Sequence, residues 1–490
     1  MRIWTGSPLR IQSTPPSAPV SDAPLPVPSL PPSGAPRVVP ATSIRLEDVD
    51  QDALRVLSRL QRNGFEAYLV GGCVRDLLLG RKPKDFDVAT AAHPRQIKRL
   101  FRNGRIIGRR FRLVHVVYGP HVVETATFRA DPIQENENDE EPGDLLITED
   151  NVYGTAAEDA RRRDFTVNAL FYDPNRNVIL DYVDGLPDIE AGILRTIGEP
   201  PTRFAEDPVR ILRAIKFATR LGFRIEEHTW SAMGEHAHML SRSAPPRVAE
   251  EILRLLRSGT ALGAFRMLRA CGALATLFPE IDRYLGRRDD PDPAAHDRAD
   301  KYWRLLEALD ADLHNKADPT PAVLLAVLYL RVVEYRTEER GEAPLAWGRI
   351  AAELIEPLAT SARLPRRAVE GAKRIITMQH RFTQPASKSS GRRLMFLHSE
   401  DFPEALHLFR LRSAAWGQGW DVYEGWLERY KHARDNPEEL GPPSAPRKRR
   451  RRGGRRRRRG GRRGEEEAEA EAGAVSTSEA HADEGDAPEL

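Results

Sequence analysis

The sequence predicts a mixed α+β domain followed by an all-helical remainder, with disordered segments at both ends. Two observations predict this order. Up to about residue 200, short apolar runs broken by glycine turns alternate with helical periodicities, and from Phe204 onward long helical periodicities dominate. Both ends of the chain lack the apolar and aromatic residues that a folded core requires. The chain has 490 residues, enough for roughly two to four domains.

The cysteine content and the apolar runs restrict the class of protein. Cys73 and Cys271 are the only cysteines and lie far apart, which argues against a disulfide scaffold or a zinc site and fits a reducing compartment. The segment Met1–Gly6 has no apolar run typical of a signal peptide. The longest apolar run, Ala322–Leu330, is too short to span a membrane. We therefore expect a cytoplasmic protein without a membrane span.

The positive charge of the chain is local. The net charge is +3, and the segment Arg447–Arg463 holds 13 basic residues and no acidic ones, so the rest of the chain carries −10. An Arg/Gly block of this kind binds RNA phosphates without sequence preference. Arg455, Arg456 and Arg457 at its centre are our candidate contacts with RNA, and the alternative is a tail that only aids solubility.

The elements of the first domain follow from apolar patterning and turn residues. Residues 1–43 are rich in Pro, Ser and Ala and are expected to be disordered. The patterns then predict helices at Leu46–Asn63, Val74–Leu79 and His93–Phe101, and strands at Ala67–Val70, Phe86–Ala89, Arg112–Tyr118 and His121–Phe128. Asp131–Asn151 is polar and acidic and predicts a mobile loop.

The remainder of the chain predicts helices and then a second disordered tail. The helical periodicities are Pro208–Leu221, Pro246–Leu256, Ala261–Ala270, Trp303–Leu309 and Pro321–Tyr335. We therefore divide the chain into five segments: disordered 1–43, a mixed domain at 44–200, helical regions at 201–290 and 291–436, and a disordered Arg/Gly-rich and then acidic tail at 437–490.

Asp85 and Asp87 are the centre of the predicted chemistry. Residues two apart on a strand share a face, so both carboxylates project together, with Phe86 on the core side. Paired carboxylates repel each other unless a cation lies between them. Mg²⁺ prefers carboxylate oxygens together with substrate phosphates, and a pair of such ions supports in-line displacement at phosphorus. The alternative is a surface strand with two solvated acids.

A glycine turn before this pair favours the functional interpretation. Gly71 and Gly72 end the preceding strand and open a helix, a geometry that offers backbone N–H groups to a phosphate. Arg75 lies on the first turn of that helix, where it can add a bidentate phosphate contact, and Asp76 follows it. The alternative for a lone Gly-Gly pair is plain backbone geometry.

These residues resemble the signature of the class II nucleotidyltransferases, the family of CCA-adding enzymes and bacterial poly(A) polymerases. The similar segments are Leu69–Gly80 and Asp85–Thr90, followed in order by Arg162–Leu170, Asp181–Gly185 and Glu206–Arg213. The similarity covers about residues 65 to 285 and implies a polymerase-β-like head followed by helical neck and body domains. It also implies catalysis with Mg²⁺, for which Mn²⁺ is an alternative, and ATP as a substrate.

The resemblance also implies roles for residues of the first domain. A third carboxylate on a strand corresponds to Glu124, giving Asp85, Asp87 and Glu124 as metal ligands; the alternative for Glu124 is an edge-strand acid facing solvent. The segment around Asp164 resembles the ribose-selecting motif. It places Arg162, Arg163 and Asp164 at the nucleotide ribose and the reacting centre, with Asp164 as a catalytic residue and Asn168 as support. The alternative for Asp164 is a structural ion pair.

A second implied motif reads the nucleobase. In Glu206–Arg213, an Asp207 acceptor beside an Arg210 donor matches a base edge with an exocyclic amine next to a ring nitrogen, which adenine and cytosine share. Arg213 follows on the same side of the helix. The alternative for Asp207 is a helix N-cap with Pro208 at the first helical position. The pair cannot distinguish an ATP-specific enzyme from one that uses both CTP and ATP.

The segment Ile106–Val116 favours poly(A) synthesis, because it resembles the stretch that marks bacterial poly(A) polymerases within the family. Arg109, Arg110 and Arg112 would supply positive charge for an RNA backbone; the alternative is a basic strand edge that prevents aggregation. We therefore expect a monomeric enzyme that adds AMP to RNA 3′ ends in RNA processing and decay, with RNA-decay proteins as further partners. The alternatives are a CCA-adding tRNA nucleotidyltransferase and a non-catalytic RNA-binding module.

Overall fold

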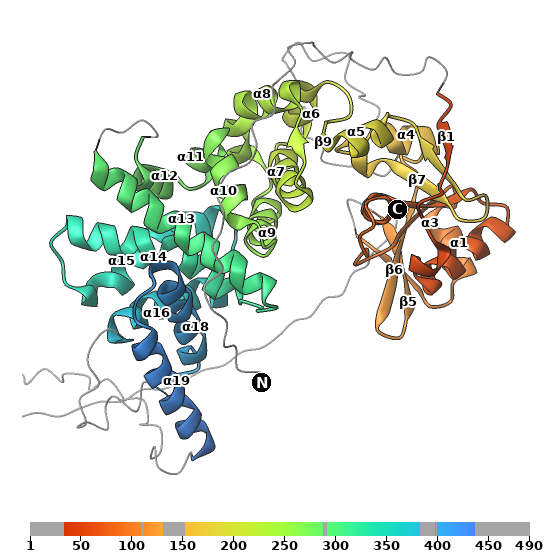
Figure 1. The fold of residues 1–490 in the computed structure, drawn as a ribbon. Helices are drawn as coiled ribbons and strands as arrows, with labels where there is room; N and C mark the ends of the chain where they lie inside the picture. The colour runs from red at the N-terminus through yellow and green to blue at the C-terminus, as the bar shows by residue number, and fades with distance from the viewer. Residues whose placement is uncertain are drawn as a thin grey trace, which may run out of the picture. The chain divides into compact units, whose positions relative to one another are not determined.

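The computed structural model describes residues 34–108, 112–130, 152–287, 292–382, 397 and 399–436. A mixed sheet with helices forms first along the chain, and helices dominate from α5 onward (Figure 1). This order confirms the predicted fold class. The acidic loop Asp131–Asn151 and nearly all of the two predicted tails lie outside the described residues.

Eight strands form the sheet. They are β1 (Arg37–Pro40), β2 (Ala67–Val70), β3 (Asp87–Thr90), β4 (Gly104–Ile107), β5 (Leu113–Tyr118), β6 (His121–Thr127), β7 (Leu170–Asp173) and β8 (Val178–Asp181). Their order across the sheet is β1-β8-β7-β2-β3-β6-β5-β4. The pairing of β3 with β6 is parallel, and the other neighbours in this sheet are antiparallel.

The two faces of the sheet pack against different helices. On one face, α1 (Gln51–Arg62), α2 (Gly72–Leu78) and α3 (Pro94–Leu100) enclose a core that includes residues of β2, β3, β5, β6, β7 and β8. On the other face, α4 (Ala156–Arg161) covers a smaller core whose strand residues come from β2, β3, β7 and β8. The strands alternate between the two cores, as the period of two of a pleated strand requires.

Helices build the rest of the described chain. They are α5 (Gly185–Ala191), α6 (Pro200–Glu206), α7 (Val209–Leu221), α8 (Glu227–His236), α9 (Pro245–Leu256), α10 (Ala261–Ala270), α11 (Ala273–Leu277), α12 (Pro279–Leu285), α13 (Pro293–His314), α14 (Pro321–Glu339), α15 (Trp347–Ser361), α16 (Arg366–Phe382), α18 (Phe402–Trp416) and α19 (Trp420–Asp435). A short parallel pair, β9 (Ile193–Leu194) and β10 (Arg224–Ile225), lies near their start. One continuous apolar core runs through them. Among the described helices, none is long and apolar enough to cross a membrane.

Three predictions about the first domain were wrong in detail. Residues 37–40, which we expected to be disordered, form β1 and pair with β8. The helix predicted from Leu46 begins at Gln51, because the side chain of Asp50 caps its first turn by accepting from the N–H groups of Asp52 and Ala53. Strands β4, β7 and β8 were not predicted, since four residues carry little periodicity.

Candidate active site

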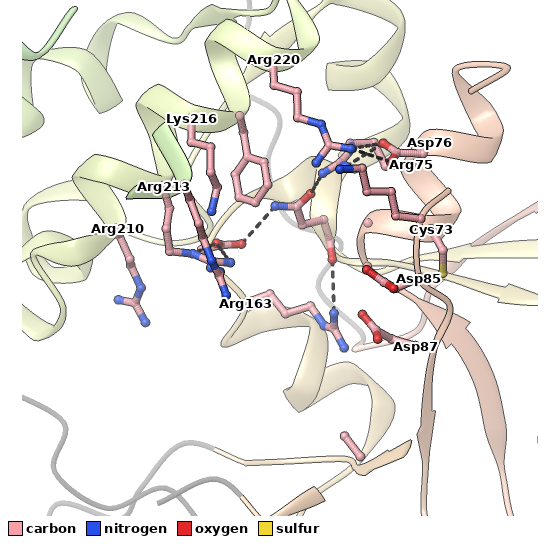
Figure 2. A pocket seen from close by; sticks show the side chains of 18 of the residues that line it. Cys73, Arg75, Asp76, Asp85, Asp87, Arg163, Arg210, Arg213, Lys216 and Arg220 are labelled. Carbon is pink, nitrogen blue, oxygen red and sulfur yellow. Dashed lines mark hydrogen bonds and ion pairs between the residues drawn. The ribbon is translucent and has the colours of Figure 1, made fainter. Parts of the chain in front are cut away.

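Asp85 and Asp87 lie where β3 begins. Asp87 is the first residue of the strand and pairs with Val70 of β2 on one side. Asp85 precedes the strand and is exposed, so the strand begins one residue later than predicted. Figure 2 shows the two carboxyl groups side by side at the edge of a cavity, with the guanidinium group of Arg163 facing them. The predicted pairing of the two acids on one side of the chain is therefore present.

The electrostatics of Asp87 fit a site that receives a cation. Burial and the negative charges of Glu124 and Asp85 raise its pKa to about 6, and the charge of Arg163 only partly offsets them. Bound positive charge would reverse this shift, because it favours the ionised carboxylate. Within the described residues, no three His, Cys, Asp or Glu side chains are already arranged as a metal site. The acids therefore have the charge pattern for a divalent cation without a closed ligand cage.

Glu124 lies on the strand next to Asp87. The parallel register of β3 and β6 places the two residues directly opposite each other, and their side chains share a face of the sheet. The Glu124 side chain is 53% exposed, and its Oε1 atom lies 3.5 Å from Nε2 of His115 on β5. The position suits the predicted third carboxylate. The side chain faces solvent as in the alternative that we considered, but β6 lies between β3 and β5 and is not an edge strand.

The Gly71–Gly72 turn joins β2 to α2 as predicted. Gly71 has φ +77° and ψ −134°, a conformation that favours glycine, and a Cβ atom there would lie 3.1 Å from Nη1 of Arg163. The side chain of Arg75 is buried rather than open to a phosphate. Its guanidinium group donates to Asp76 Oδ1 from Nε at 2.9 Å and from Nη2 at 2.6 Å, and also to Asn168 Oδ1.

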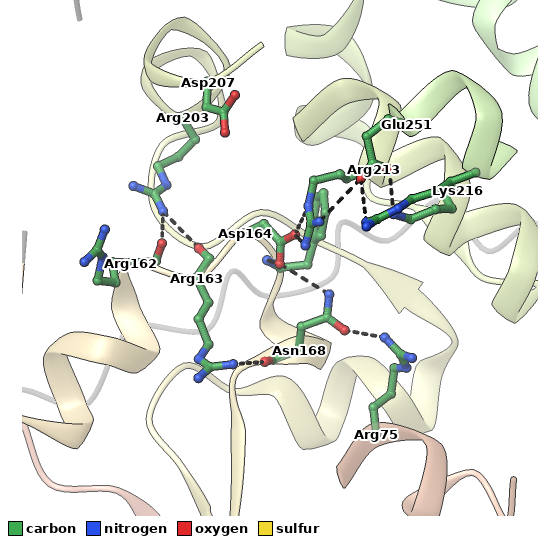
Figure 3. A network of polar contacts seen from close by, with 12 residues as sticks. Arg75, Arg162, Arg163, Asp164, Asn168, Arg203, Asp207, Arg213, Lys216 and Glu251 are labelled. Atoms are coloured by element: carbon green, nitrogen blue, oxygen red, sulfur yellow. Dashed lines mark hydrogen bonds and ion pairs between the residues drawn. The ribbon is translucent and has the colours of Figure 1, made fainter. Parts of the chain in front are cut away.

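The segment that contains Asp164 crosses between the sheet and the first neck helices. Arg163 donates to Asp159 from Nη2 at 2.8 Å and to the carbonyl oxygen of Asn168 from Nη1 at 3.4 Å. The side chain of Arg162 donates to the carbonyl oxygen of Ala130. The carbonyl groups of both arginines accept from Nη2 of Arg203 on α6, at 2.7 and 2.9 Å (Figure 3). Polar contacts from both sides therefore fix this short segment.

Asp164 forms the ion pair that we considered as the alternative to a catalytic role. Arg213 of α7 donates to its Oδ2 atom at 2.7 Å, and Asn168 donates to its Oδ1 atom at 3.3 Å (Figure 3). Burial opposes ionisation of Asp164, but Arg213 and Asn168 outweigh it and hold the pKa below its usual value. Asp164 is thus a stable carboxylate that joins the sheet domain to α7, and its predicted catalytic role stays a prediction.

Asp207 does not cap α7, which corrects our alternative for this residue. Pro208 occupies the N-cap position and the helix begins at Val209, without a side-chain cap. The carboxylate of Asp207 instead accepts two hydrogen bonds from Arg247 of α9, at 2.9 and 2.6 Å. Arg210 donates from Nη1 to the carbonyl oxygen of Arg203 and to Oε2 of Glu206. Both members of the predicted base-reading pair are thus held by neighbouring side chains.

These groups line one cavity of about 880 Å³. It brings together all the predicted catalytic and nucleotide-binding residues: Gly71, Gly72, Arg75, Asp76, Asp85, Asp87, Arg162, Arg163, Asp164, Asn168, Asp207, Arg210 and Arg213. Glu124 is not among the residues that line it. Twelve basic and six acidic residues line the cavity, so its net charge is positive and suits a polyphosphate.

The cavity also contains residues that sequence reasoning missed. Phe217 of α7 lies beneath three cationic groups, with the Arg75 and Arg213 guanidinium carbons 5.3 and 5.4 Å and the Lys216 Nζ atom 4.9 Å from its ring centre. Lys216 donates to Glu251 Oε2 at 2.6 Å. The helical spacing of Arg213, Lys216 and Phe217 could have indicated a shared face. Arg247 comes from another helix, and no local pattern connects it with Asp207.

The predicted RNA-binding arginines are only partly described. Arg112 is exposed directly before β5. Arg109, Arg110, Arg455, Arg456 and Arg457 lie outside the described residues. Their contact with RNA stays a prediction.

Three family models match the chain. Residues 67–195 match the poly A polymerase head domain, and residues 222–285 match a probable RNA- and SrmB-binding site of polymerase A. Residues 341–463 match the arginine-rich C-terminus of polymerase A. The third match begins within the predicted body and ends within the predicted tail.

The chain is similar to two groups of proteins, poly(A) polymerases and CCA-adding enzymes. The chain is 37% identical to poly(A) polymerase I of Salmonella typhi over 380 residues, covering 76% of this chain and 80% of the relative. It is 48% identical to poly(A) polymerase I of Haemophilus influenzae over 246 residues, covering 50% of this chain and 54% of the relative. It is 34% identical to a CCA-adding enzyme of Lactobacillus delbrueckii subsp. bulgaricus over 273 residues, covering 55% of this chain and 66% of the relative.

Solved structures support the fold. The CCA-adding enzyme of Bacillus stearothermophilus in complex with CTP matches with a TM-score of 0.58 and 26% identity, covering 81% of this chain and 89% of that one. The CCA-adding enzyme of Thermotoga maritima complexed with tRNA matches with a TM-score of 0.53 at 21% identity, covering 81% and 86%. The second likeness bears on the fold alone.

Proposed function

Because the chain belongs to the family of bacterial poly(A) polymerases, which includes the related CCA-adding enzymes, we propose that it is a polynucleotide adenylyltransferase. It adds AMP from ATP to RNA 3′ ends without a template. The observation that carries this proposal is the positively charged cavity that holds Asp85, Asp87 and the Gly71 turn together with Asp207 and Arg210. One cavity thus combines groups suited to a phosphate chain, a reacting phosphorus and a nucleobase.

The acids at the sheet edge would hold the metal. Asp85 and Asp87, with Glu124 beside them, would bind divalent cations, Mg²⁺ or in its place Mn²⁺, which supply positive charge to the phosphoryl group being transferred. The raised pKa of Asp87 supports this role. The Gly71–Gly72 turn lines the cavity at the start of α2, where the N–H group of Gly72 would receive a phosphate oxygen, since that of Gly71 donates to the carbonyl oxygen of Leu170 at 3.3 Å. The excess of basic side chains in the cavity would neutralise the rest of the triphosphate.

The remaining predicted residues position the nucleotide. Arg163 faces the acids (Figure 2), and Asn168 links Arg75 to Asp164, so this segment is fixed before ATP arrives. We propose that Asp164, already engaged by Arg213, positions the segment rather than accepting a proton. Asp207 retains unused lone pairs beside Arg247, because a carboxylate offers about four acceptor sites. It can therefore accept from the adenine amine while Arg210 donates to the ring nitrogen.

Adenylation is favoured over CCA addition by the extent of the similarity along the chain. The alignment with the Salmonella poly(A) polymerase covers 80% of that protein, whereas that with the Lactobacillus CCA-adding enzyme covers 66% of it. The match to an arginine-rich C-terminus supports an enzyme that accepts many RNA ends. RNA-decay proteins as further partners, and a monomeric state in the cytoplasm, remain part of this proposal.

Two substrates decide between adenylation and CCA addition. The full chain is incubated with tRNA lacking its terminal CCA or with an unstructured RNA, and each receives ATP alone or CTP alone. Long extension of the unstructured RNA with ATP alone is the expected result. CTP-dependent addition that stops after a few nucleotides on tRNA would instead assign the chain to the CCA-adding enzymes. Absence of any extension, with RNA binding retained, would indicate a non-catalytic RNA-binding protein.

A further inference from the structure

The face of the sheet that carries Asp87 continues past the acids toward the β4 edge. Paired residues in neighbouring strands share a face. Asp87 lies opposite Glu124, Glu124 opposite His115, and His115 opposite Arg105, so the four residues form one row across β3, β6, β5 and β4. Nε2 of His115 lies 3.5 Å from Glu124, and Arg105 at the far end of the row is exposed.

Apolar side chains flank this row on the same face. The register places Ile107 opposite Leu113 and Val117 opposite Val122, all on the side of Glu124. Ile107 is 43% exposed and Val122 is 44% exposed. Ile107 and Val122 therefore lie on the two sides of the row, and each offers an exposed apolar contact there. We call the following residues the distal face: Arg105, Ile107, Leu113, His115, Val117 and Val122.

The distal face is open, whereas the opposite side of β5 and β6 is closed; on β4, Ile106 is also 44% exposed on that opposite side. Val114, Val116 and Val123 point the other way and are buried in the core beneath α1 and α3. The core under α4 contains residues of β2, β3, β7 and β8 but none of β4, β5 or β6 within the strand bounds. In the part of the chain that the structure describes, the core under α4 therefore covers the Asp87 side of the sheet only as far as β3, next to Asp87 and Glu124.

The two substrates of nucleotidyl transfer must approach Asp87 from opposite sides. In an in-line displacement, the attacking oxygen and the leaving pyrophosphate lie on opposite sides of the phosphorus. The residues proposed to bind the nucleotide lie on the β2 and β7 side of Asp87, since Gly71 follows β2 and Asn168 precedes β7. The cavity takes one residue from β6, Ala126, and none from β4 or β5. The attacking 3′ hydroxyl group therefore approaches across β6.

We propose that the distal face binds the last nucleotides of the RNA primer. The proposal rests on the proposed function and names the subsite for the second substrate. Arg105 contacts a backbone phosphate, and His115 lies between it and Glu124, close to where the terminal ribose must lie. Ile107 and Val122 pack against the sugar or base of the terminal nucleotides, a contact that every base can make and that suits an enzyme acting on diverse RNAs.

A double substitution tests the apolar part of the distal face. Ile107→Ser with Val122→Ser is made in the full chain, and AMP addition to an oligoadenylate primer is measured while primer and ATP are varied separately. We expect KM for the primer to rise about 5- to 30-fold, which corresponds to about 1–2 kcal/mol of lost apolar contact, with KM for ATP unchanged. An unchanged KM for the primer together with a lowered Tm would show that another segment of the chain covers this face, and would overturn the proposal.

The matched control for this variant is Val38→Ser. Val38 is 48% exposed on β1, at the opposite edge of the same sheet. It should leave both KM values unchanged. An equal rise in KM for the primer in the control would mean that the effect is not specific to the distal face.

A crosslinking experiment tests the position of the RNA independently of catalysis. A primer with 4-thiouridine as its last nucleotide is irradiated with the Asp87→Asn form of the full chain, so that the RNA binds without being extended. We expect crosslinked peptides from residues 105–122, and we expect Arg105→Ala to reduce the yield and the salt dependence of binding. Crosslinks confined to the helical regions would overturn the proposal. Failure of the parent chain to extend any RNA would instead count against the proposed function.

Discussion

Asp87 combines partial burial with two nearby negative charges, and this has a measurable effect on stability. Its pKa is about 6 in the folded protein and 3.8 in the unfolded chain. A raised folded-state pKa of an acid means that the folded state loses stability as pH rises from about 4 to about 6. The site is therefore least favourable to the fold at neutral pH, where a bound cation would relieve the repulsion.

Replacing Asp87 by Asn should separate activity from stability. We expect Asp87→Asn to reduce AMP addition by at least about 10²- to 10³-fold, since a ligand for the transferring group is lost. Its Tm at pH 7, without added metal, should rise, because the amide carries no charge and removes the repulsion. Thermal unfolding at pH 4 and pH 7 is the measurement. A Tm gain equal at both pH values would contradict the electrostatic explanation.

Arg247 should determine how Asp207 presents its acceptor. Its two hydrogen bonds fix the carboxylate of Asp207 from a different helix. We expect Arg247→Ala to raise KM for ATP by about tenfold, because each well-formed charged hydrogen bond contributes about 1.5–3 kcal/mol before relaxation. Steady-state kinetics with ATP and with CTP would show whether base preference also changes.

A suitable control for this variant is Arg349→Ala. Arg349 also donates to two carboxylates, those of Glu342 and Glu353, but it is 52% exposed and lies on α15. Its loss should leave KM for ATP unchanged. If both variants raised KM equally, the effect could not be assigned to Asp207.

At the residue scale, the sequence predicted Asp85 and Asp87 as a pair but did not predict the arginine partners of Asp164 and Asp207. Asp85 and Asp87 were predictable as a pair because an extended chain brings residues two apart onto one side, although only Asp87 lies on the strand itself. The side-chain states of Asp164 and Asp207 were not, because each depends on an arginine from a helix that the chain reaches 40 or more residues later. Local spacing contains no information about such contacts, so the N-cap alternative for Asp207 looked equally reasonable.

The turn between β2 and α2 is an element whose shape depends on one glycine. Gly71→Ala should destabilise the protein by about 1–3 kcal/mol, because φ +77° is strained for alanine and the added methyl group approaches Arg163. It should also raise KM for ATP by displacing the N–H group of Gly72. Urea denaturation and steady-state kinetics are the two measurements.

Gly80→Ala is the matched control for this turn. Gly80 also has a positive φ, +65°, but no atom lies within 4 Å of its added Cβ. It should lose about 1–2 kcal/mol of stability and keep its KM for ATP. A kinetic effect of similar size in both variants would mean that the turn geometry is not what binds the nucleotide.

Helices were easier to predict than strands. The helix at Ala261–Ala270 was predicted with its observed bounds, and that of α7 to within one residue, since an amphipathic helix repeats its pattern over several turns. Strands β1 and β4 have four residues each and lie at the two edges of the sheet. At an edge the partner strand, rather than the local pattern, determines the extended conformation. The interior strands β7 and β8, also of four residues, were missed as well, because so short a run shows little periodicity.

On the scale of the whole molecule, the Arg/Gly block should contribute RNA affinity without contributing to catalysis. The block lies within residues 442–490, outside the described residues. Ending the chain after Gly441 should raise KM for RNA by about tenfold or more near 0.1 M salt and leave KM for ATP unchanged. The slope of log KM against log salt should also become shallower.

A second truncation provides the control. Residues 465–490 contain the acidic segment without the arginines, so ending the chain after Gly464 should not weaken RNA binding. If both truncations raised KM for RNA equally, chain length rather than positive charge would explain the loss.

The parallel pairing of β3 with β6 has a consequence for the order in which the protein folds. Hairpins close quickly because their strands are neighbours in sequence, whereas a parallel pair forms only after the intervening chain has folded back. Asp87 and Glu124 are opposite each other in this pair, and α3, β4 and β5 lie between them in sequence. During folding, Asp87 and Glu124 therefore stay apart until β3 and β6 pair, which is a late, non-local step. Adenylating activity should consequently appear after most of the helical signal during refolding.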